Sequence, residues 1–232
     1  MLHRIPTYIK RLDEILGGGL TSGEISLVYG EAETAKTTLA MQCAVNCARR
    51  GYKTLFIDCD GTFSTKRLSQ IASEDFEKIS ELVILARPKD FKEQAALIDQ
   101  LNNYVAKGFG LIVVDTLTFL YRIEVSEKPE KTFMLNRELN RQMAWLAQVA
   151  KTQKLAVLVM SQVRNVFEEG CVEVEPVATR VLKFWADTII FMKPTENPQI
   201  VSLTITKKSK TTQPFSCQLQ ICKNGLCDYS LD

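Results

Sequence analysis

The stretch of sequence that decides the fold is Gly30-Glu31-Ala32-Glu33-Thr34-Ala35-Lys36-Thr37-Thr38. An apolar run at 25–29 precedes it, and a helical pattern at 39–50 follows it. A glycine-started loop between a strand and a helix, ending in Lys-Thr, is typical of a phosphate-binding P-loop. Backbone N–H groups of such a loop and the helix N-terminus together bind phosphate oxygens.

Each residue of 30–38 is therefore a predicted contact of ATP. Lys36 would reach the β- and γ-phosphates, and the hydroxyl of Thr37 would hold Mg²⁺. The pattern G-x-x-x-x-G-K-[ST] calls for glycine at position 35, where this chain has Ala35. The added Cβ falls where the loop backbone is tightly packed, so the motif predicts nucleotide binding and leaves efficient catalysis in question.

Length and composition favour one large α/β domain. The chain has 232 residues, no Pro-rich linker, and a net charge of only +2, which does not by itself indicate a nucleic-acid partner. Apolar runs are too short for a membrane span, and the N-terminus lacks the apolar core of a signal peptide. We expect a soluble, cytoplasmic protein without a membrane partner.

Strands and helices alternate along most of the sequence, which predicts an α/β fold with a mostly parallel, twisted sheet flanked by helices. The expected strands are 24–29, 53–58, 82–86, 110–115 and 155–160. The expected helices are 11–16, 37–50, 64–72, 90–107, 132–153 and 177–184. Antiparallel strands are expected at 188–192, 200–206, 216–221 and 226–230, extending one edge of the sheet.

Polar residues stand where the expected parallel strands end, and these ends meet at one edge of a sheet. Asp115 closes an apolar strand and fits the Walker B acid that positions Mg²⁺, although a capping role before a helix is the alternative. Asp60 lies where a general base would polarise water. Gln162 would sense the γ-phosphate and pass that information to the following segment. Either could instead be an ordinary loop polar residue.

Several motifs in order resemble the RecA-type recombinase cores, most closely the RadB-like paralogues of the archaeal and eukaryotic branch. The matching segments are 12–20, 56–63, 111–116, 120–122, 138–142 and 161–163. The resemblance covers nearly the whole chain. It implies a RecA-like P-loop ATPase core, ATP and Mg²⁺ as cofactors, and a role in homologous recombination and DNA repair.

The same resemblance implies further contacts and partners. Arg67 would stack on adenine, and Lys208 with Lys210 would contact ATP in a neighbouring subunit. The lysines at 207, 208 and 210 have two alternative interpretations. They could lie at the solvated end of a hairpin, or on a hairpin that contacts DNA phosphates. The expected partners are single-stranded or branched DNA, bound weakly, and the main RecA-family recombinase or other paralogues, with homo-oligomers as a further option.

The departures from the family pattern predict reduced activity. Asp60 stands where the family has Glu, and the shorter side chain would reach less far toward the attacking water. After Gln162, where recombinases carry a DNA-binding loop, the chain has Glu168, Glu169, Glu173 and Glu175. Carboxylates repel a phosphate backbone, while Arg164 and Arg180 only partly offset them.

The family's N-terminal helical DNA-binding domain and its Phe-x-x-Ala subunit peg also have no counterpart in residues 1–232, which we expect to form a single core domain. We therefore expect weak ATP hydrolysis and no strand exchange by this chain alone. Two other functions remain open. The chain could be a degenerate P-loop domain that acts as a protein-interaction module, or a KaiC-like signalling ATPase.

The cysteines give one further expectation. Asn224-Gly225 is a two-residue hairpin signal, which would place Cys222 directly opposite Cys227 at a separation that permits a disulfide. Two reduced thiols are the expected state in a reducing compartment.

Overall fold

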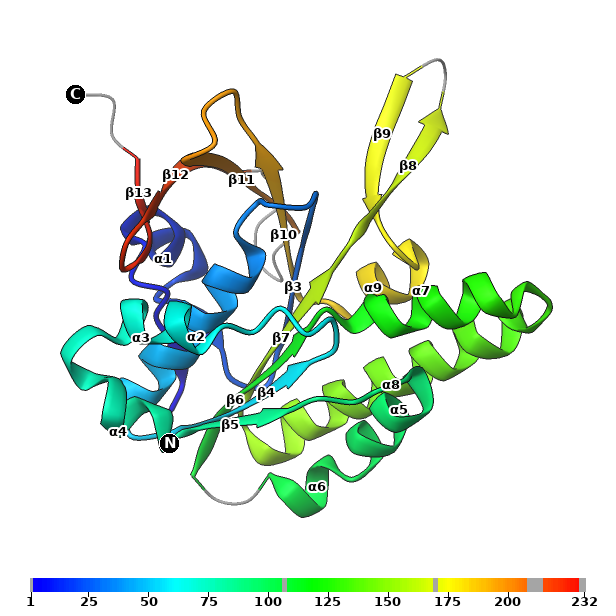
Figure 1. Cartoon of the computed structure of the whole chain (residues 1–232), viewed down its shortest axis with the longest axis horizontal. Helices are drawn as coiled ribbons and strands as arrows, with labels where there is room; N and C mark the ends of the chain where they lie inside the picture. The colour runs from blue at the N-terminus through cyan, green and yellow to red at the C-terminus, as the bar shows by residue number, and fades with distance from the viewer. Residues whose placement is uncertain (1, 106–107, 169–170, 208–214, 230–232) are drawn as a thin grey trace.

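A nine-stranded sheet forms the centre of the computed structural model, with strand order β13-β12-β11-β10-β3-β7-β6-β4-β5 (Figure 1). The structure describes residues 2–105, 108–168, 171–207 and 215–229, and the side chains of 165–173 are not among the described features. Strands β3, β7, β6, β4 and β5 run parallel, and β10 pairs in parallel with β3. The strands β11 to β13 continue the sheet as antiparallel neighbours, as predicted. The strand expected at 188–192 was predicted to belong to this antiparallel set, but β10 runs parallel to β3 and antiparallel to β11.

The strands of this sheet have the following bounds: β3 Ile25–Gly30, β4 Lys53–Asp58, β5 Val83–Ala86, β6 Phe109–Asp115, β7 Ala156–Ser161, β10 Thr188–Pro194, β11 Ile200–Lys207, β12 Phe215–Cys222 and β13 Gly225–Asp228. Two small two-stranded sheets accompany it, β1 Arg4–Ile5 with β2 Leu20–Thr21, and β8 Val163–Glu168 with β9 Cys171–Pro176. The β8–β9 hairpin projects away from the body of the molecule (Figure 1).

Helices cover both faces of the central sheet (Figure 1). One face packs against α1 Lys10–Leu16, α2 Lys36–Arg49, α3 Thr65–Ala72 and α4 Phe76–Ser80. The other packs against α5 Phe91–Asp99, α6 Leu101–Tyr104, α7 Leu117–Glu127, α8 Thr132–Gln153 and α9 Thr179–Trp185. Short 3₁₀ turns lie at η1 Ser73–Asp75 and η2 Pro129–Lys131. None of the helices in the described ranges combines the length and apolar character needed to cross a lipid bilayer.

The central strand β6 shows why the sequence folds this way. Its residues are apolar without alternation, because both of its faces are covered by helices. Leu111 and Val113 belong to the core under α2, whereas Ile112 and Val114 belong to the core under α8. Helix starts follow local chemistry as well, since the Asp90 carboxylate accepts a hydrogen bond from the Glu93 backbone N–H at 2.7 Å.

Several element predictions differ from the structure, and α4 and the β1–β2 pair were not predicted. The helix expected over 90–107 is divided, because α5 ends at Asp99 and α6 covers Leu101–Tyr104. Helix α7 was not predicted, since its apolar start directly continues the apolar strand before it. The segment after Gln162 was expected as a loop and instead forms the β8–β9 hairpin.

The register of the C-terminal hairpin is also different from the prediction. Cys222 lies opposite Gly225, and Cys227 lies opposite Gln220, so the two cysteines are not a directly opposed pair. Both are free thiols. The cause is the buried side chain of Gln42, whose Oε1 accepts from the Leu226 backbone N–H at 2.7 Å while its Nε2 donates to the Leu226 carbonyl oxygen at 3.1 Å. A tertiary contact therefore overrides the local Asn-Gly turn signal.

Candidate functional site

The loop between β3 and α2 is built on a glycine that no other residue could replace. A Cβ on Gly30 would meet the Met192 carbonyl oxygen at 2.1 Å, because β10 runs directly beside β3 at this point. After Gly30 the chain turns through 31–35, and α2 begins at Lys36. The N-terminal end of this helix therefore points its free N–H groups into the loop, as phosphate binding requires.

Ala35 adopts the left-handed conformation that the motif reserves for glycine, with φ 62° and ψ 25°. This conformation costs an L-residue roughly 1–2 kcal/mol relative to glycine. The loop thus keeps the backbone conformation expected with glycine at this position. The cost of having Ala35 there is local backbone strain. The departure at Ala35 does not by itself remove the loop's ability to surround a phosphate.

The side chain of Lys36 lies inside this loop. Its Nζ donates to the Glu31 carbonyl oxygen and, at 3.2 Å, to the Thr34 hydroxyl. Burial lowers the pKa of the Lys36 ammonium, while the carboxylates of Asp115 and Asp60 oppose that shift. A cation held by neutral oxygen atoms at the centre of a loop of N–H groups is suited to exchange those partners for charged phosphate oxygens.

Asp115 lies beneath the loop at the end of β6, with only 1 % of its surface exposed. Its Oδ1 lies 3.2 Å from the Thr116 hydroxyl oxygen, whose single proton is donated to Asp60 at the shorter distance of 2.8 Å, and no hydrogen-bond partner of its Oδ2 occurs among the described residues. Burial raises the pKa of Asp115 to about 6, and the nearby Thr37 hydroxyl opposes this rise. A buried carboxylate oxygen without a partner is an unsatisfied ligand.

These residues fit Mg²⁺ bound together with a nucleotide. Within the described ranges, no group of three or more His, Cys, Asp or Glu side chains could hold a metal ion by itself. Mg²⁺ in such sites is held by one or two protein oxygens, with phosphates and water completing the octahedron. Thr37 and Asp115 are the two protein groups that would hold it here.

Asp60 approaches the loop from the segment after β4. Its Oδ2 accepts from the Thr116 hydroxyl at 2.8 Å, and its Oδ1 accepts from the Thr62 hydroxyl at 2.6 Å. Both carboxylate oxygens are therefore engaged by hydroxyl groups. A water molecule would have to compete with these hydroxyls, or share the oxygens with them, in order to be activated by Asp60.

Gln162 follows directly after β7. Its Oε1 accepts from Arg122 Nη1 at 2.6 Å, and its backbone carbonyl oxygen accepts from the Val177 N–H at 3.0 Å. The residue therefore joins the end of β7 to helix α7 and to the end of the β8–β9 hairpin.

These groups surround one cavity of about 450 Å³, which we call the nucleotide cavity. Its lining consists of Gly30, Ala32, Glu33, Thr34, Ala35, Lys36, Thr37, Thr38, Asp60, Thr62, Thr116, Arg122, Gln162 and Val163. Asp115 lies buried below it, and Glu31 contributes its carbonyl oxygen to Lys36. Sequence reasoning missed the roles of Thr62, Thr116 and Arg122, although each lies inside a segment that matches the family pattern.

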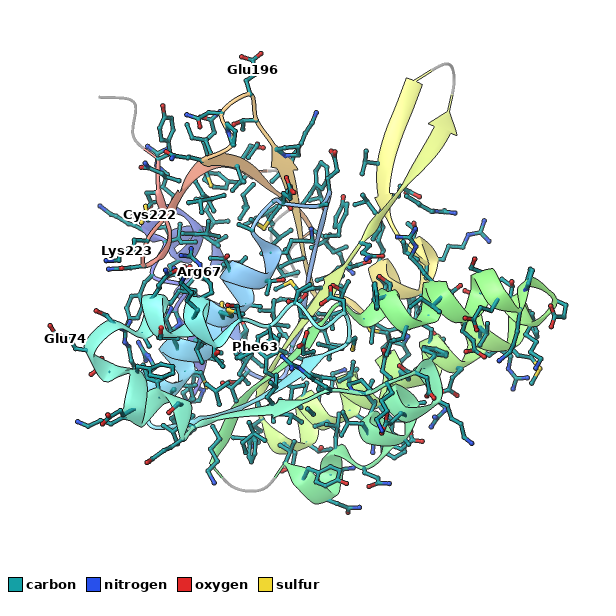
Figure 2. The ribbon with its side chains drawn as sticks, viewed as in Figure 1. Phe63, Arg67, Glu74, Glu196, Cys222 and Lys223 are labelled. Atoms are coloured by element: carbon teal, nitrogen blue, oxygen red, sulfur yellow. The ribbon has the colours of Figure 1, made fainter. Side chains whose placement is uncertain are left out.

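Arg67 does not line this cavity. Its guanidinium donates to the backbone carbonyl oxygens of Cys222 at 3.0 Å and Lys223 at 2.8 Å, in the β12–β13 turn. Figure 2 shows the three residues side by side. These bonds use the edge of the guanidinium, and a stacking contact would use its planar face, so adenine stacking by Arg67 stays a prediction.

The predicted lysine contacts cannot be placed in the same way. Lys208 and Lys210 lie outside the described residues. Lys207 donates through Nζ to the carbonyl oxygens of Lys183 and Ala186, the first at 3.2 Å. Its ammonium group is thus already engaged at the end of α9.

A second cavity of about 700 Å³ lies between α7, the start of α8, the base of β8 and α9, and we call it the arginine groove. Arg122, Arg164 and Arg180 line it, together with hydroxyl and amide side chains such as Thr132 and Asn136. No carboxylate occurs among its described lining residues. The groove therefore presents a cationic surface with polar hydrogen-bond donors.

Of the four glutamates in the acidic segment, the structure describes the side chain of Glu175. Glu175 Oε1 accepts from Lys183 Nζ at 3.0 Å, and its Oε2 lies 3.5 Å from Arg164 Nη2. The Lys183 ammonium lowers the pKa of the Glu175 carboxyl, so this carboxylate is paired. Glu169 lies outside the described residues, as do the side chains of Glu168 and Glu173.

Comparison with known proteins agrees with this geometry. The Rad51 family model matches residues 1–229 of the chain. The chain belongs to the Rad51 family. A RadB recombinase crystal structure superimposes on it with a TM-score of 0.83 and 30 % sequence identity, covering 97 % of this chain and 100 % of that one. The RecA-like fold and the resemblance to RadB-like paralogues are thereby confirmed.

Two relatives of this Rad51-family chain are named DNA repair and recombination protein RadB. The relative from Methanococcoides burtonii is 32 % identical over 217 residues, covering 94 % of each chain. The relative from Methanocaldococcus jannaschii is 35 % identical over 182 residues, covering 77 % of this chain and 82 % of its own length. These matches support the recombinase interpretation over a KaiC-like signalling ATPase.

Proposed function

We propose that this chain binds Mg-ATP in the nucleotide cavity and assists a main RecA-family recombinase in homologous recombination and DNA repair. The observation that carries the proposal is the combination of Lys36 inside the loop with the partnerless Asp115 oxygen beneath it. A cation for phosphate and an anion for Mg²⁺ are thus fixed at the same helix N-terminus. When bound, Mg-ATP would supply the transferable phosphoryl group, and Lys36, Thr37 and Asp115 would orient it.

Hydrolysis is proposed to be slow. Asp60 carries one methylene fewer than the glutamate of the family pattern, and both of its oxygens already accept from Thr62 and Thr116. Activation of water depends on a base within hydrogen-bond reach of the attacking molecule. The ATP-bound form of the chain is therefore the form proposed to assist the recombinase, and the chain does not carry out strand exchange by itself.

The arginine groove is the proposed contact for single-stranded or branched DNA. Its three arginines come from α7, β8 and α9, but Arg164 is paired with Glu175, so Arg122 and Arg180 are the two proposed to neutralise phosphates. Two such contacts on a single strand give a slope of about −1.4 in a plot of log affinity against log salt. Arg122→Ala with Arg180→Ala should flatten that slope, and an unchanged slope would place DNA elsewhere.

The edge of the central sheet formed by β5 is the proposed contact for the recombinase. Strand β5 is outermost, and no other described strand pairs with its free side. Ile84 and Leu85 in this strand are 40 % and 38 % exposed. An extended apolar segment of a partner could add to such an edge by backbone pairing. Ile84→Arg should abolish co-sedimentation with the recombinase, and sedimentation of the chain alone would show whether a second copy uses the same edge.

The direct test of nucleotide binding is calorimetry with Mg-ATP on the wild-type protein and on Lys36→Ala. Charge-assisted hydrogen bonds contribute about 1.5–3 kcal/mol each, so the variant should bind about tenfold to a hundredfold more weakly. Lys92→Ala, which removes an exposed lysine of α5, is the matched control. Equal affinity of Lys36→Ala and the wild-type protein would refute the nucleotide assignment and favour a degenerate domain that only binds proteins.

A further inference from the structure

Two cysteines of the C-terminal hairpin are accessible to solvent. Cys222 ends β12 and is half-buried, and Cys227 in β13 is exposed. The other cysteines whose side chains the structure describes are all buried, namely Cys43, Cys47, Cys59 and Cys217. Because the reaction of a thiol with a small oxidant requires access, Cys222 and Cys227 are the thiols of this set that such an oxidant meets first.

The two thiols are in contact across the hairpin. Cys227 lies opposite Gln220, which is two residues before Cys222, so both cysteines are on one face of the hairpin as diagonal neighbours. A hydrogen bond joins their thiol groups. Partial burial, together with this hydrogen bond, raises the pKa of the Cys227 thiol to about 11, so its oxidation is faster at alkaline pH.

A disulfide between these cysteines requires the turn to move. Diagonal neighbours of an antiparallel pair have Cα atoms about 7–8 Å apart, whereas a disulfide accepts about 4.4–6.8 Å. The movement has a defined alternative state in the sequence. A turn centred on Asn224 and Gly225 would place Cys222 directly opposite Cys227.

Two helices hold the turn in its present position. The Arg67 guanidinium of α3 donates to the carbonyl oxygens of Cys222 at 3.0 Å and Lys223 at 2.8 Å (Figure 2). On the side of α2, a Cβ on Gly225 would lie 2.3 Å from Gln42 Oε1. The carbonyl oxygens bound by Arg67 belong to the backbone that a disulfide would displace, so disulfide formation and the Arg67 contact oppose each other.

We propose that Cys222 and Cys227 are a modification site at which a low-molecular-weight disulfide forms a reversible disulfide bond, and that closing this bond releases Arg67 from the β12–β13 turn. One cysteine thiolate attacks the small disulfide and expels a thiolate. The second cysteine, after losing its proton, attacks the sulfur of the mixed disulfide and expels the other thiolate. Two cysteine thiols lose two electrons and two protons, and the small disulfide is reduced to two thiols.

The sequence offers a direct assay, because trypsin cleaves after Lys223, between the two cysteines. Residues 211–223 and 224–232 are therefore separate peptides in the reduced protein and one linked species in the oxidised protein. The folded protein is equilibrated at pH 8.5 in mixtures of reduced and oxidised glutathione, its free thiols are blocked, and the digest is analysed by mass spectrometry. We expect the linked species, two hydrogens lighter than the sum of the peptides, and its loss in dithiothreitol.

Serine variants identify the cysteines involved. Cys222→Ser and Cys227→Ser should each lack the linked species. Peptide 211–223 also contains Cys217, so a linked species that persists in Cys222→Ser would assign the bond to Cys217 and overturn the proposal. Absence of the linked species from the wild-type protein in the most oxidising mixture, even after pretreatment with diamide, would overturn it as well.

The release of Arg67 has its own measurement. If the oxidised turn lacks the hydrogen bonds from Arg67, Arg67→Ala should raise the equilibrium constant for disulfide formation by about tenfold, or about 30 mV, since each such bond involves a charged donor. Lys66→Ala, which removes an exposed neighbour in α3, is the matched control and should keep the wild-type value. An unchanged constant in Arg67→Ala would show that Arg67 still holds the oxidised turn, and would overturn the release.

Discussion

Replacing Asp115 by Asn should stabilise the protein in the absence of nucleotide while removing its Mg²⁺ dependence. Burial raises the pKa of the Asp115 carboxyl from its ordinary value of 3.8 to about 6. The folded state therefore binds this proton more tightly than the unfolded chain does. Stability must fall as pH rises from below 3.8 through 6, because ionisation is easier in the unfolded chain. Above pH 6 the full penalty is present.

The size of the effect follows from the shift in pKa. A difference of about two pKa units corresponds to about 3 kcal/mol at neutral pH, and roughly half of that is already present at pH 5. Asparagine cannot ionise, so Asp115→Asn should raise the free energy of unfolding by about 1–3 kcal/mol at pH 7.5. For a chain of this length each kcal/mol corresponds to about 2–4 °C in Tm.

Urea unfolding of the metal-free and nucleotide-free protein at pH 5 and pH 7.5 measures this difference. Glu74→Gln is the matched control, since it removes a carboxylate from an exposed position in η1 (Figure 2). Calorimetry with ATP should then show that Mg²⁺ no longer strengthens binding to Asp115→Asn. The reasoning fails if Asp115→Asn is no more stable than the wild-type protein at pH 7.5, or if its advantage is the same at both pH values.

Two further changes test the loop. The double variant Ala35→Gly with Asp60→Glu should release phosphate from ATP faster than the wild-type protein. The first change removes the strain of a left-handed alanine, and the second lengthens the carboxylate side chain toward the attacking water. An unchanged rate in the folded double variant would mean that neither departure limits turnover. Gly30→Ala should lower Tm sharply and abolish ATP binding, since its Cβ would lie 2.1 Å from the Met192 carbonyl oxygen, and a wild-type melting curve would contradict the packing argument.

Elements with a strong local signal could be predicted from the sequence. Helix α8 has the predicted bounds 132–153, and strand β4 has the predicted bounds 53–58. In both segments the hydrophobic pattern and the flanking residues agree with the tertiary environment. The phosphate loop was predictable for the same reason, because strand, glycine, Lys-Thr and helix follow each other within one short segment.

Features decided by tertiary contacts could not be predicted. The turn register depends on Gln42, a residue 184 positions before Leu226, whose buried amide binds that residue's backbone. Helix α7 was missed because Leu117, Leu120 and Tyr121 are apolar like the strand before them, and no Gly or Pro marks the boundary. The role of Arg122 could not be predicted, because it depends on where the end of β7 meets α7.

The arginine groove shows the same limit for electrostatics. Along the chain, the segment after Gln162 has more carboxylates than arginines, which predicted repulsion of DNA. In space, Glu175 pairs with Lys183 and Arg164, and the arginines of α7, β8 and α9 face one cavity without a carboxylate in its described lining. Whether a binding surface is positively or negatively charged depends on which charged side chains the fold brings onto it. Counting charges along the sequence does not show which side chains these are. Arg122 lines both this groove and the nucleotide cavity. The fold therefore joins two sites that the sequence motifs indicate separately.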